Sequence, residues 1–258
     1  KSNAPNPISM HTTALINCQR FFDTYAKAFQ GEDVVVIEIG SQDVNGSIRA
    51  CCPSHFYYCG VDFVEGNGVD IILEDPYHLP FDDASVDIVL TNSCLEHSEM
   101  FWLLFLEAMR ILKPHGILYI NVPSNAEFHR YPVDCWRFYP DSGRALVSWA
   151  RRNDMDPELL ESFTSEQVGD VWNDYVAIFV KDKNQASRYP DRALSGREDI
   201  SNGLLLGSDI LINPKPSPED KRMLYCIDRI INGELQLPDG DTKLGLIKKI
   251  LNNQIKVR

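Results

Sequence analysis

The sequence lacks the signals of several common protein classes. No G-x-G-x-x-G turn follows an apolar strand, which argues against an NAD-binding fold. None of the seven cysteines lies in a C-x-x-C pair, so we expect no zinc site or disulfide framework, and a reducing, cytoplasmic location. No apolar run is long enough to cross a bilayer. Because 25 Lys and Arg face 37 Asp and Glu, the net charge of -12 argues against a general nucleic-acid binder.

Strand-like and helix-like segments alternate through the first half of the 258 residues. Helices are expected from Thr13 to Phe29, from about Gly46, and from Glu99 to Leu112, which is strongly apolar. The expected strands are short and apolar: Val34 to Ile39, Phe56 to Val61, Val69 to Leu73, Val86 to Thr91 and Ile117 to Val122. Strands that alternate with helices predict an α/β fold with a doubly wound, mostly parallel sheet.

The pattern changes after the fifth strand. A helix is expected from Arg144 to Arg152, followed by strands from Leu159 to Phe163 and from Tyr175 to Lys181. Too few residues separate these two strands for a crossover helix, so we expect an antiparallel edge strand. Polar residues from Asp182 to Asn202 predict a linker or loop.

The chain therefore divides into three expected parts. Residues 1–182 form the α/β domain with its N-terminal helix, 183–218 a linker or loop, and 219–258 a helical C-terminal tail. The tail is expected to hold two amphipathic helices, from Glu219 to Asn232 and from Lys243 to Asn253. It either packs on the domain or belongs beside a neighbouring module. Because the first residue is not Met, we also expect a processed form or a domain of a longer protein.

The end of the first strand has the composition of a ligand-binding turn. Gly40 permits a sharp turn at the strand's carboxyl end, where open α/β sheets bind their ligands. Glu38 lies just before this turn, and burial of its carboxylate without a partner is costly. We therefore expect Glu38 to face a bound cationic or hydroxyl-bearing group.

Five segments, in order, resemble class I S-adenosylmethionine-dependent methyltransferases. They are Glu38 to Ser41, Gly60 to Asp62, Glu74 to Phe81, Ser85 to His97 and Arg110 to Gly116. The resemblance covers roughly residues 34–181 and implies a Rossmann-like fold with S-adenosyl-L-methionine as the cofactor. It assigns Asp62 to the ribose hydroxyls and the Asp75 segment to the adenine. The full set of implied cofactor-binding residues is Glu38, Gly40, Ser41, Asp43, Asp62, Phe63, Asp75, Pro76, Asn92 and Ser93. The first segment departs from the usual E-x-G-x-G-x-G, since only its first glycine is in place.

A second, longer segment from Pro123 to Asp141, together with the variant first turn, resembles methyltransferases encoded among polysaccharide-synthesis genes. This resemblance implies an O-methyltransferase that acts on a sugar hydroxyl of a glycan, for example a terminal deoxyhexose such as rhamnose. The implied partners are a glycan or nucleotide-sugar acceptor and either neighbouring glycosyltransferase domains or a second copy of the chain. Alternatives are a small-molecule methyltransferase of the same fold and a non-catalytic scaffold module in a glycosyltransferase assembly.

A hydroxyl acceptor needs a base to remove its proton, and three side chains near the strand ends can supply one. His129 follows the fifth strand, with Asp134 close by to orient it or to act as the base itself, and His97 follows the fourth strand. The alternatives are that His129 caps its loop and that His97 is structural. Arg130, Trp136, Arg137 and Tyr139 are candidates for acceptor binding, with packing in the core as the alternative for Trp136. No metal is expected, because the only adjacent carboxylate pair, Asp82-Asp83, is better explained by a solvated turn.

Overall fold

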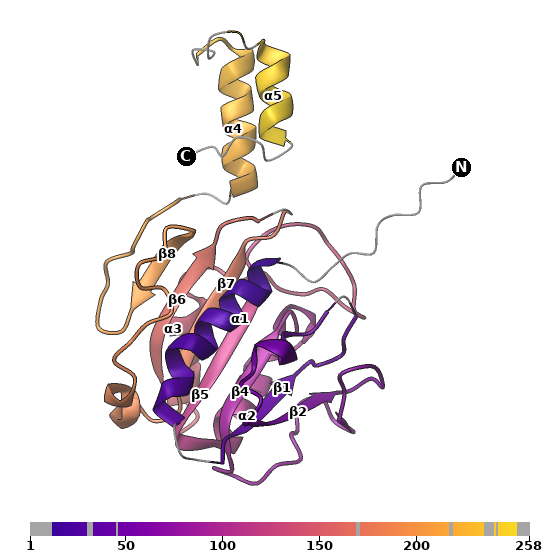
Figure 1. Ribbon diagram of the computed structural model, residues 1–258, viewed down its shortest axis with the longest axis vertical. Coiled ribbons are helices and arrows are strands. Elements are labelled where there is room, and N and C mark those ends of the chain that lie inside the picture. Colours follow the sequence, from indigo (N-terminus) through magenta and orange to yellow (C-terminus); the bar gives the residue numbers. More distant parts are fainter. Residues whose placement is uncertain are drawn as a thin grey trace.

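The computed structural model describes residues 12–29, 33–44, 46–168, 171–216, 219–234, 240 and 242–251 (Figure 1). The expected end of the last helix, Asn253, lies outside these ranges. One sheet runs through the molecule in the strand order β3-β2-β1-β4-β5-β7-β6-β8. The strands are β1 (Val35–Ile39), β2 (Tyr57–Asp62), β3 (Ile71–Ile72), β4 (Val86–Asn92), β5 (Leu112–Pro123), β6 (Glu158–Ser165), β7 (Asp174–Val180) and β8 (Ile200–Leu205).

The parallel half of the sheet is doubly wound. The β1 strand pairs in parallel with β2 on one side and with β4 on the other, and β5 continues the sheet next to β4. The direction of winding therefore reverses between β1 and β4, at the position where such sheets bind ligands. The predicted fold class is confirmed, including antiparallel strands at one edge: β7 lies between β5 and β6 and runs antiparallel to both.

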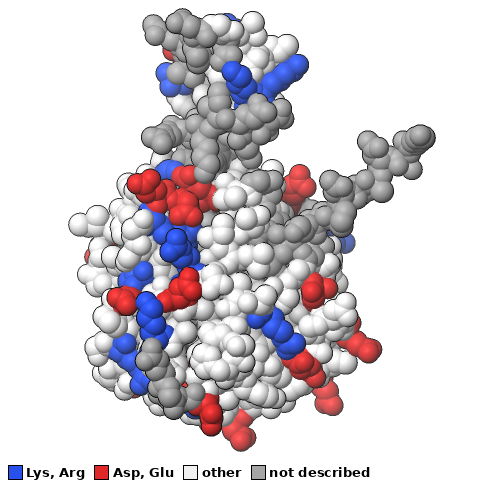
Figure 2. Space-filling view, in the orientation of Figure 1, with Lys and Arg blue, Asp and Glu red and all other residues white. Residues whose placement is uncertain are grey.

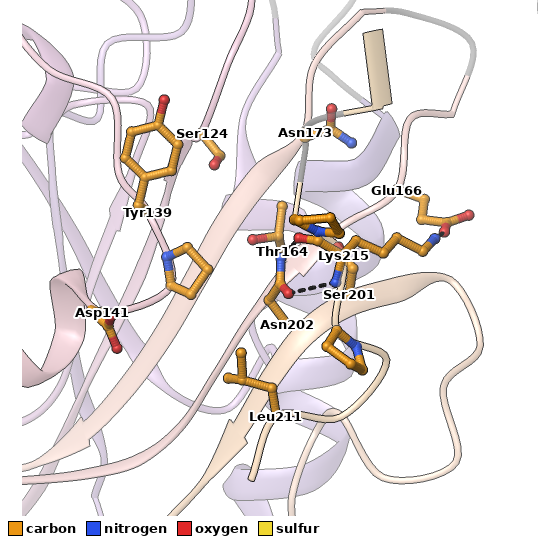
Figure 3. A pocket seen from close by; sticks show the side chains of 13 residues that line it. Ser124, Tyr139, Asp141, Thr164, Glu166, Asn173, Ser201, Asn202, Leu211 and Lys215 are labelled. Atoms are coloured by element: carbon orange, nitrogen blue, oxygen red, sulfur yellow. Dashed lines mark hydrogen bonds and ion pairs between the residues drawn. The ribbon is translucent and has the colours of Figure 1, made fainter. Parts of the chain in front are cut away.

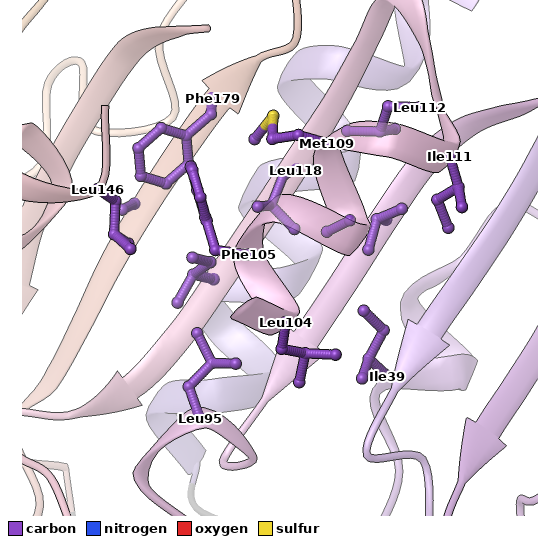
Figure 4. Close-up of a cluster of buried hydrophobic side chains, with 14 of the residues drawn as sticks. Ile39, Leu95, Leu104, Phe105, Met109, Ile111, Leu112, Leu118, Leu146 and Phe179 are labelled. Atoms are coloured by element: carbon purple, nitrogen blue, oxygen red, sulfur yellow. The ribbon is translucent and has the colours of Figure 1, made fainter. Parts of the chain in front are cut away.

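Helices cover both faces of the sheet. On one face α1 (Thr12–Tyr25) packs its aromatic side chains, such as Phe21, against Tyr119 of β5, and the ring centroids lie 4.9 Å apart. On the other face α2 (Phe101–Ile111) buries Leu104, Phe105 and Met109 against the sheet (Figure 4). Helix α3 (Ser142–Arg151) adds to the cluster on this face, which packs against β4 and β5.

The prediction of a helix from about Gly46 is wrong, because the segment forms a shorter element. The structure has only one 3-10 turn, Ile48–Cys51, which begins where Ser47 Oγ accepts the N–H of Arg49. The turn ends because Cys52 precedes Pro53, and a residue before proline avoids the helical region. Accordingly, Cys52 is extended, with φ -70° and ψ 135°.

The linker expected after residue 182 is also wrong in part, because it contains the 3-10 turn Lys183–Arg188 and strand β8. Strand β8 pairs antiparallel with β6 and buries Ile200 and Leu204. The chain leading to it is anchored by the buried Glu161 carboxylate, which accepts the backbone N–H groups of Ala193 (2.7 Å) and Leu194 (2.9 Å). This segment therefore extends the sheet.

The two predicted tail helices are present as α4 (Glu219–Ile231) and α5 (Lys243–Leu251). They pack on each other through a small cluster centred on Ile230, Leu246 and Ile250, and in Figure 1 the pair stands beyond the end of the sheet. Among the described residues, no helix combines the length and the apolar character that a membrane crossing requires. Acidic and basic side chains alternate on the face shown in Figure 2.

Candidate active site

The turns after β1 and β4 are in close contact at the switch point. Gly40 has a φ of +77°, and a Cβ atom built there would lie 2.6 Å from both Cβ and Sγ of Cys94. Only glycine fits this conformation and this spacing. The close approach brings the residues that follow β4 directly beside the first turn.

Glu38 has an internal partner in the structure. Its buried carboxylate accepts a hydrogen bond of 2.5 Å from the hydroxyl of Tyr58, whose ring lies 4.8 Å from the guanidinium carbon of Arg49. Burial raises the pKa of Glu38 to about 7, although the Tyr58 hydrogen bond and the charge of Arg49 oppose the shift. The hydroxyl-bearing group that we expected from a ligand is thus supplied by a tyrosine of the protein.

Asp62 joins two turns at the end of β2. One of its oxygens accepts the N–H of Gln42 (3.1 Å) and the other accepts the N–H of Val64 (3.2 Å). The next residue, Phe63, leaves its ring 48% exposed. This arrangement places a buried carboxylate beside an accessible aromatic ring at the edge where the strands end.

The other predicted cofactor residues fall into two groups. Asp43 and Asp75 are exposed, and each accepts a backbone N–H from a residue that follows it, which stabilises its own turn. Ser41 and Asn92, at the ends of β1 and β4, each have a buried side-chain oxygen without a hydrogen-bond partner. Such atoms are costly in a closed core, so they favour a polar ligand at this edge.

Two of the three predicted catalytic residues lie ring to ring. His97, in the 3-10 turn Leu95–His97 after β4, donates its Nδ1–H to the backbone oxygen of Val133 at 2.5 Å. The His129 ring lies perpendicular to it, with the centroids 4.9 Å apart. Burial lowers the pKa of His97, which keeps the imidazole neutral. Strand ends that are far apart in the sequence therefore bring two imidazoles together.

The third predicted residue, Asp134, orients His129. Its Oδ2 accepts the backbone N–H of His129 at 2.7 Å and lies 3.5 Å from the Nδ1 of the same residue. Burial opposes the ionisation of Asp134, but hydrogen bonds from Arg137 and His129 outweigh it and lower its pKa to about 2. An acid this strong is a poor base, so orientation of His129 is the better role for Asp134.

Arg137 stabilises the loop that carries these groups. Its guanidinium forms a two-point ion pair with Asp134 (2.6 and 2.9 Å) and donates to three backbone oxygens, those of Asn125, Glu127 and Trp136. These contacts use all five N–H donors of an arginine side chain. No donor is left for the acceptor contact that we predicted for Arg137.

The remaining predicted acceptor residues differ in exposure. Trp136 donates its Nε1–H to the backbone oxygen of Ser98 at 2.9 Å, and its ring packs on Phe101, so it helps to fix the loop on α2. Arg130 and Tyr139 are exposed. Trp136 is itself 36% exposed, so all three keep side-chain surface accessible to an acceptor.

Sequence reasoning missed three residues of this site. Glu96 is only 1% exposed, and its Oε1 lies 3.7 Å from Nε2 of His97. Burial raises the pKa of Glu96 to about 8. The rings of Tyr131 and Trp172 lie edge-on to His129, with centroids 6.2 and 4.9 Å away. The pairing of an acid with His97 in adjacent positions was the only available signal, and nothing in the sequence links Trp172 to the site.

A cavity of about 400 Å³ lies beside the same loop (Figure 3). Its lining combines Ser124 and Tyr139, from the two ends of the loop, with residues of β6, β8 and the chain that follows β8, and its apolar surface exceeds its polar surface. The polar residues that line the cavity also include Asp141, Thr164, Glu166, Asn173, Ser201, Asn202 and Lys215. Neither this cavity nor the strand β8 on its wall was predicted.

Residues 24–120 match the model of a methyltransferase domain. The match ends within β5, before the loop that carries His129 and before the antiparallel strands. The predicted class of enzyme is thus confirmed: the protein is an S-adenosylmethionine-dependent methyltransferase, and S-adenosylmethionine is its cofactor.

Solved structures of methyltransferases are also similar to this chain. One is a 1,6-didemethyltoxoflavin-N1-methyltransferase of Burkholderia thailandensis, with 16% identity, a TM-score of 0.43, and coverage of 71% of this chain and 93% of that one. Another is the complex of the Haloferax volcanii Trm112 methyltransferase activator with a methyltransferase (16% identity, TM-score 0.44, 68% and 97% coverage). We draw no conclusion about the acceptor from similarities at this level. No curated protein matches the chain.

The edge of the methyltransferase domain fits its cofactor. The unpartnered oxygens of Ser41 and Asn92 and the buried carboxylate of Asp62 all lie at carboxyl ends of parallel strands. A molecule with an amino acid, a ribose and a base offers hydroxyl and amino donors to such oxygens. The site therefore suits a large polar ligand at the switch point.

Proposed function

We propose that this methyltransferase acts on a sugar hydroxyl of a glycan, for example a terminal deoxyhexose such as rhamnose. The observation that supports O-methylation is the position of His129, oriented by Asp134, next to His97 at the ends of β4 and β5. An alcohol is a weak nucleophile until a base takes its proton, and a positioned imidazole contributes about 10²–10⁴-fold in rate.

The chemistry assigned to the loop is a proton transfer. The Nδ1 of His129 lies 3.1 Å from the backbone oxygen of Glu127, so this nitrogen carries the hydrogen and Nε2 has the free electron pair. When bound, S-adenosylmethionine supplies an electrophilic methyl group on a positively charged sulfur. As the acceptor oxygen bonds to that methyl carbon, the carbon–sulfur bond would break with its electron pair left on sulfur, and the hydroxyl proton would pass to Nε2 of His129. The ionised Asp134 stabilises the positive charge that develops on the ring.

For the cofactor, we propose that Asp62 accepts hydrogen bonds from the ribose hydroxyls and that Asp75 lies near the adenine amino group. Phe63 and Pro76 then cover the apolar faces of the base. The first turn, from Glu38 to Asp43, together with Asn92 and Ser93, holds the methionine end. The basis is the position of these residues around the switch point between β1 and β4.

A sugar is favoured as the acceptor by the surroundings of the loop. Aromatic rings such as Tyr131 and Trp172 border His129, and aromatic faces suit the apolar face of a sugar. The neighbouring cavity is lined by carboxylate, amide and hydroxyl groups, among them Asp141 and Asn202. We further propose a cytoplasmic location and a glycan or nucleotide-sugar acceptor as the partner.

The test is methyl transfer from labelled S-adenosylmethionine to a panel of acceptors. Rhamnosyl glycans and nucleotide sugars form one arm, and catechols and quinones form the other. We expect label in the sugar arm. The labelled product should be a methyl ether, which is stable to base, and mass spectrometry identifies it. Label only in catechols or quinones would show that the sugar assignment is wrong. A His129→Ala variant that still binds the cofactor is the control for transfer at this site.

A further inference from the structure

Three potential metal ligands meet beside the switch point. Glu96, His97 and His129 each offer one ligand atom, and these atoms all lie within 4.8 Å of one another. Within the part of the chain that the structure describes, no other group of three His, Cys, Asp or Glu side chains has this spacing. The group unites the turn after β4 with the loop after β5.

The two imidazoles are oriented as metal ligands are. The Nδ1–H of His97 donates to the Val133 backbone oxygen (2.5 Å), and the Nδ1 of His129 lies 3.1 Å from the Glu127 backbone oxygen. A carbonyl oxygen only accepts, so each Nδ1 carries the hydrogen and each Nε2 keeps its electron pair. Histidines that bind metals almost always donate their other ring N–H to a carbonyl or carboxylate. Asp134, 3.5 Å from the same Nδ1, adds a carboxylate behind His129.

Glu96 completes the group from the interior. Its side chain is almost fully buried, Oε1 lies 3.7 Å from Nε2 of His97, and Oε2 has no hydrogen-bond partner. At 3.7 Å, Oε1 and Nε2 are too far apart for a hydrogen bond. The guanidinium of Arg137 forms its ion pair with Asp134. A bound cation would satisfy all three groups at once.

We propose that Glu96, His97 and His129 bind one divalent transition-metal ion of the zinc class. Two imidazoles and one carboxylate form the ligand set of zinc sites that keep an open position. In a tetrahedral site with bonds of about 2.1 Å, neighbouring ligand atoms lie about 3.4 Å apart. The Glu96–His97 distance of 3.7 Å is close to this value. The His129 ring, in the loop between β5 and α3, would move closer to the other two ligands to complete the site.

The use of such an ion in catalysis rests on the proposed function. With the open position taken by the acceptor hydroxyl, the ion would make that hydroxyl more acidic. The proton would leave to solvent, the acceptor oxygen would bond to the methyl carbon, and the carbon–sulfur bond would break. In the metal-loaded protein the ion would take over the role that the proposed function gives to His129, because a metal-bound Nε2 cannot accept a proton. Ion binding does not depend on which acceptor is used.

The experiment is a Co²⁺ titration of the full chain after removal of metals with a chelator, followed by visible absorption. We expect one equivalent to bind, with the absorption of a low-symmetry site of nitrogen and oxygen ligands. Loss of an outer partner weakens metal sites by about 10–100-fold, so Glu96→Gln and His129→Ala should each weaken binding by more than about 100-fold. The matched control is His55→Ala, because His55 is an exposed histidine far from the site in the fold. Circular dichroism of each variant checks its folding, and His129→Ala, at a half-buried loop position, keeps the test valid if Glu96→Gln does not fold.

Several results would overturn the site: no stoichiometric Co²⁺ binding by the wild type, unchanged binding by Glu96→Gln and His129→Ala, or strong thiolate absorption that points to cysteine ligands. A separate assay distinguishes the site from the proposed function. Metal binding without methylation of any sugar supports the site and contradicts the acceptor assignment. Equal sugar methylation by metal-free and metal-loaded protein supports the acceptor assignment and contradicts the role of the ion in the reaction.

Discussion

The substitution Glu38→Gln should change how the stability of the protein depends on pH. Glu38 is buried against the Tyr58 hydroxyl, and its pKa of about 7 lies above the ordinary value of 4.5. The folded protein therefore holds this proton more tightly than the unfolded chain does. Such a group contributes stability that is fully present below about pH 4.5 and is lost as the pH rises through about 7. Glutamine has a similar shape and stays neutral throughout.

The size of the effect follows from the two pKa values. At about 1.4 kcal/mol per pH unit, the interval from 4.5 to about 7 corresponds to about 3 kcal/mol. Most of it, about 2.5 kcal/mol, falls between about pH 5 and about pH 8.5. Relative to the wild type, the Glu38→Gln variant should therefore gain about 2.5 kcal/mol of unfolding free energy over this range. For a chain of this size, that corresponds to about 5–10 °C in Tm.

The assay is urea unfolding of both proteins at several pH values, without cofactor. Glu74→Gln is the control, because Glu74 is an exposed acid, and its curve should follow that of the wild type. Parallel curves for wild type and Glu38→Gln across the whole range would refute the reasoning. They would show that the proton on Glu38 does not change with pH in this interval, in spite of its burial.

Three further predictions concern the site. Asp62→Asn should weaken S-adenosylmethionine binding at least about 10-fold by calorimetry, because an amide disturbs the two backbone N–H groups that the carboxylate holds. His129→Ala should lower turnover by about 10²–10⁴-fold with cofactor affinity retained, whereas His55→Ala should leave both unchanged; weakened cofactor binding would indicate a structural role. Arg137→Lys should lower the unfolding free energy by about 1–3 kcal/mol and reduce turnover, since lysine cannot reproduce the two-point pair with Asp134; an unchanged melting curve and rate would contradict the loop role.

The parallel half of the fold could be predicted because its signals are local. Strands such as β1 and β4 are short apolar runs that end in turn residues, and their order along the chain fixes the place of the switch point. For the same reason the turn at Gly40 and the carboxylate of Asp62 could be found from the sequence. His97 and His129 could be placed only approximately, from the strand ends that they follow.

The rest depends on contacts between distant segments. Strand β8 contains Ser201, Asn202 and Gly203, which weaken any strand signal, and it forms because the edge of β6 is available for pairing. Trp172 reaches His129 only because β7 is inserted next to β5. Glu96 looked like an ordinary acid near a turn, and only the folded turn shows that its carboxylate points into the interior.

The five hydrogen bonds of Arg137 have a consequence for how this enzyme can change its acceptor during evolution. All of them end on residues 125–136, so the loop is fixed from within and depends little on its outermost side chains. Those side chains, Phe128, Arg130 and Tyr131, are exposed at the tip. With the acceptor bound as proposed, exchanges there would alter acceptor choice while the backbone around His129 stays held by Arg137. The loop thus separates residues free to vary from residues under constraint, and new acceptor specificities can arise by a few substitutions at the tip.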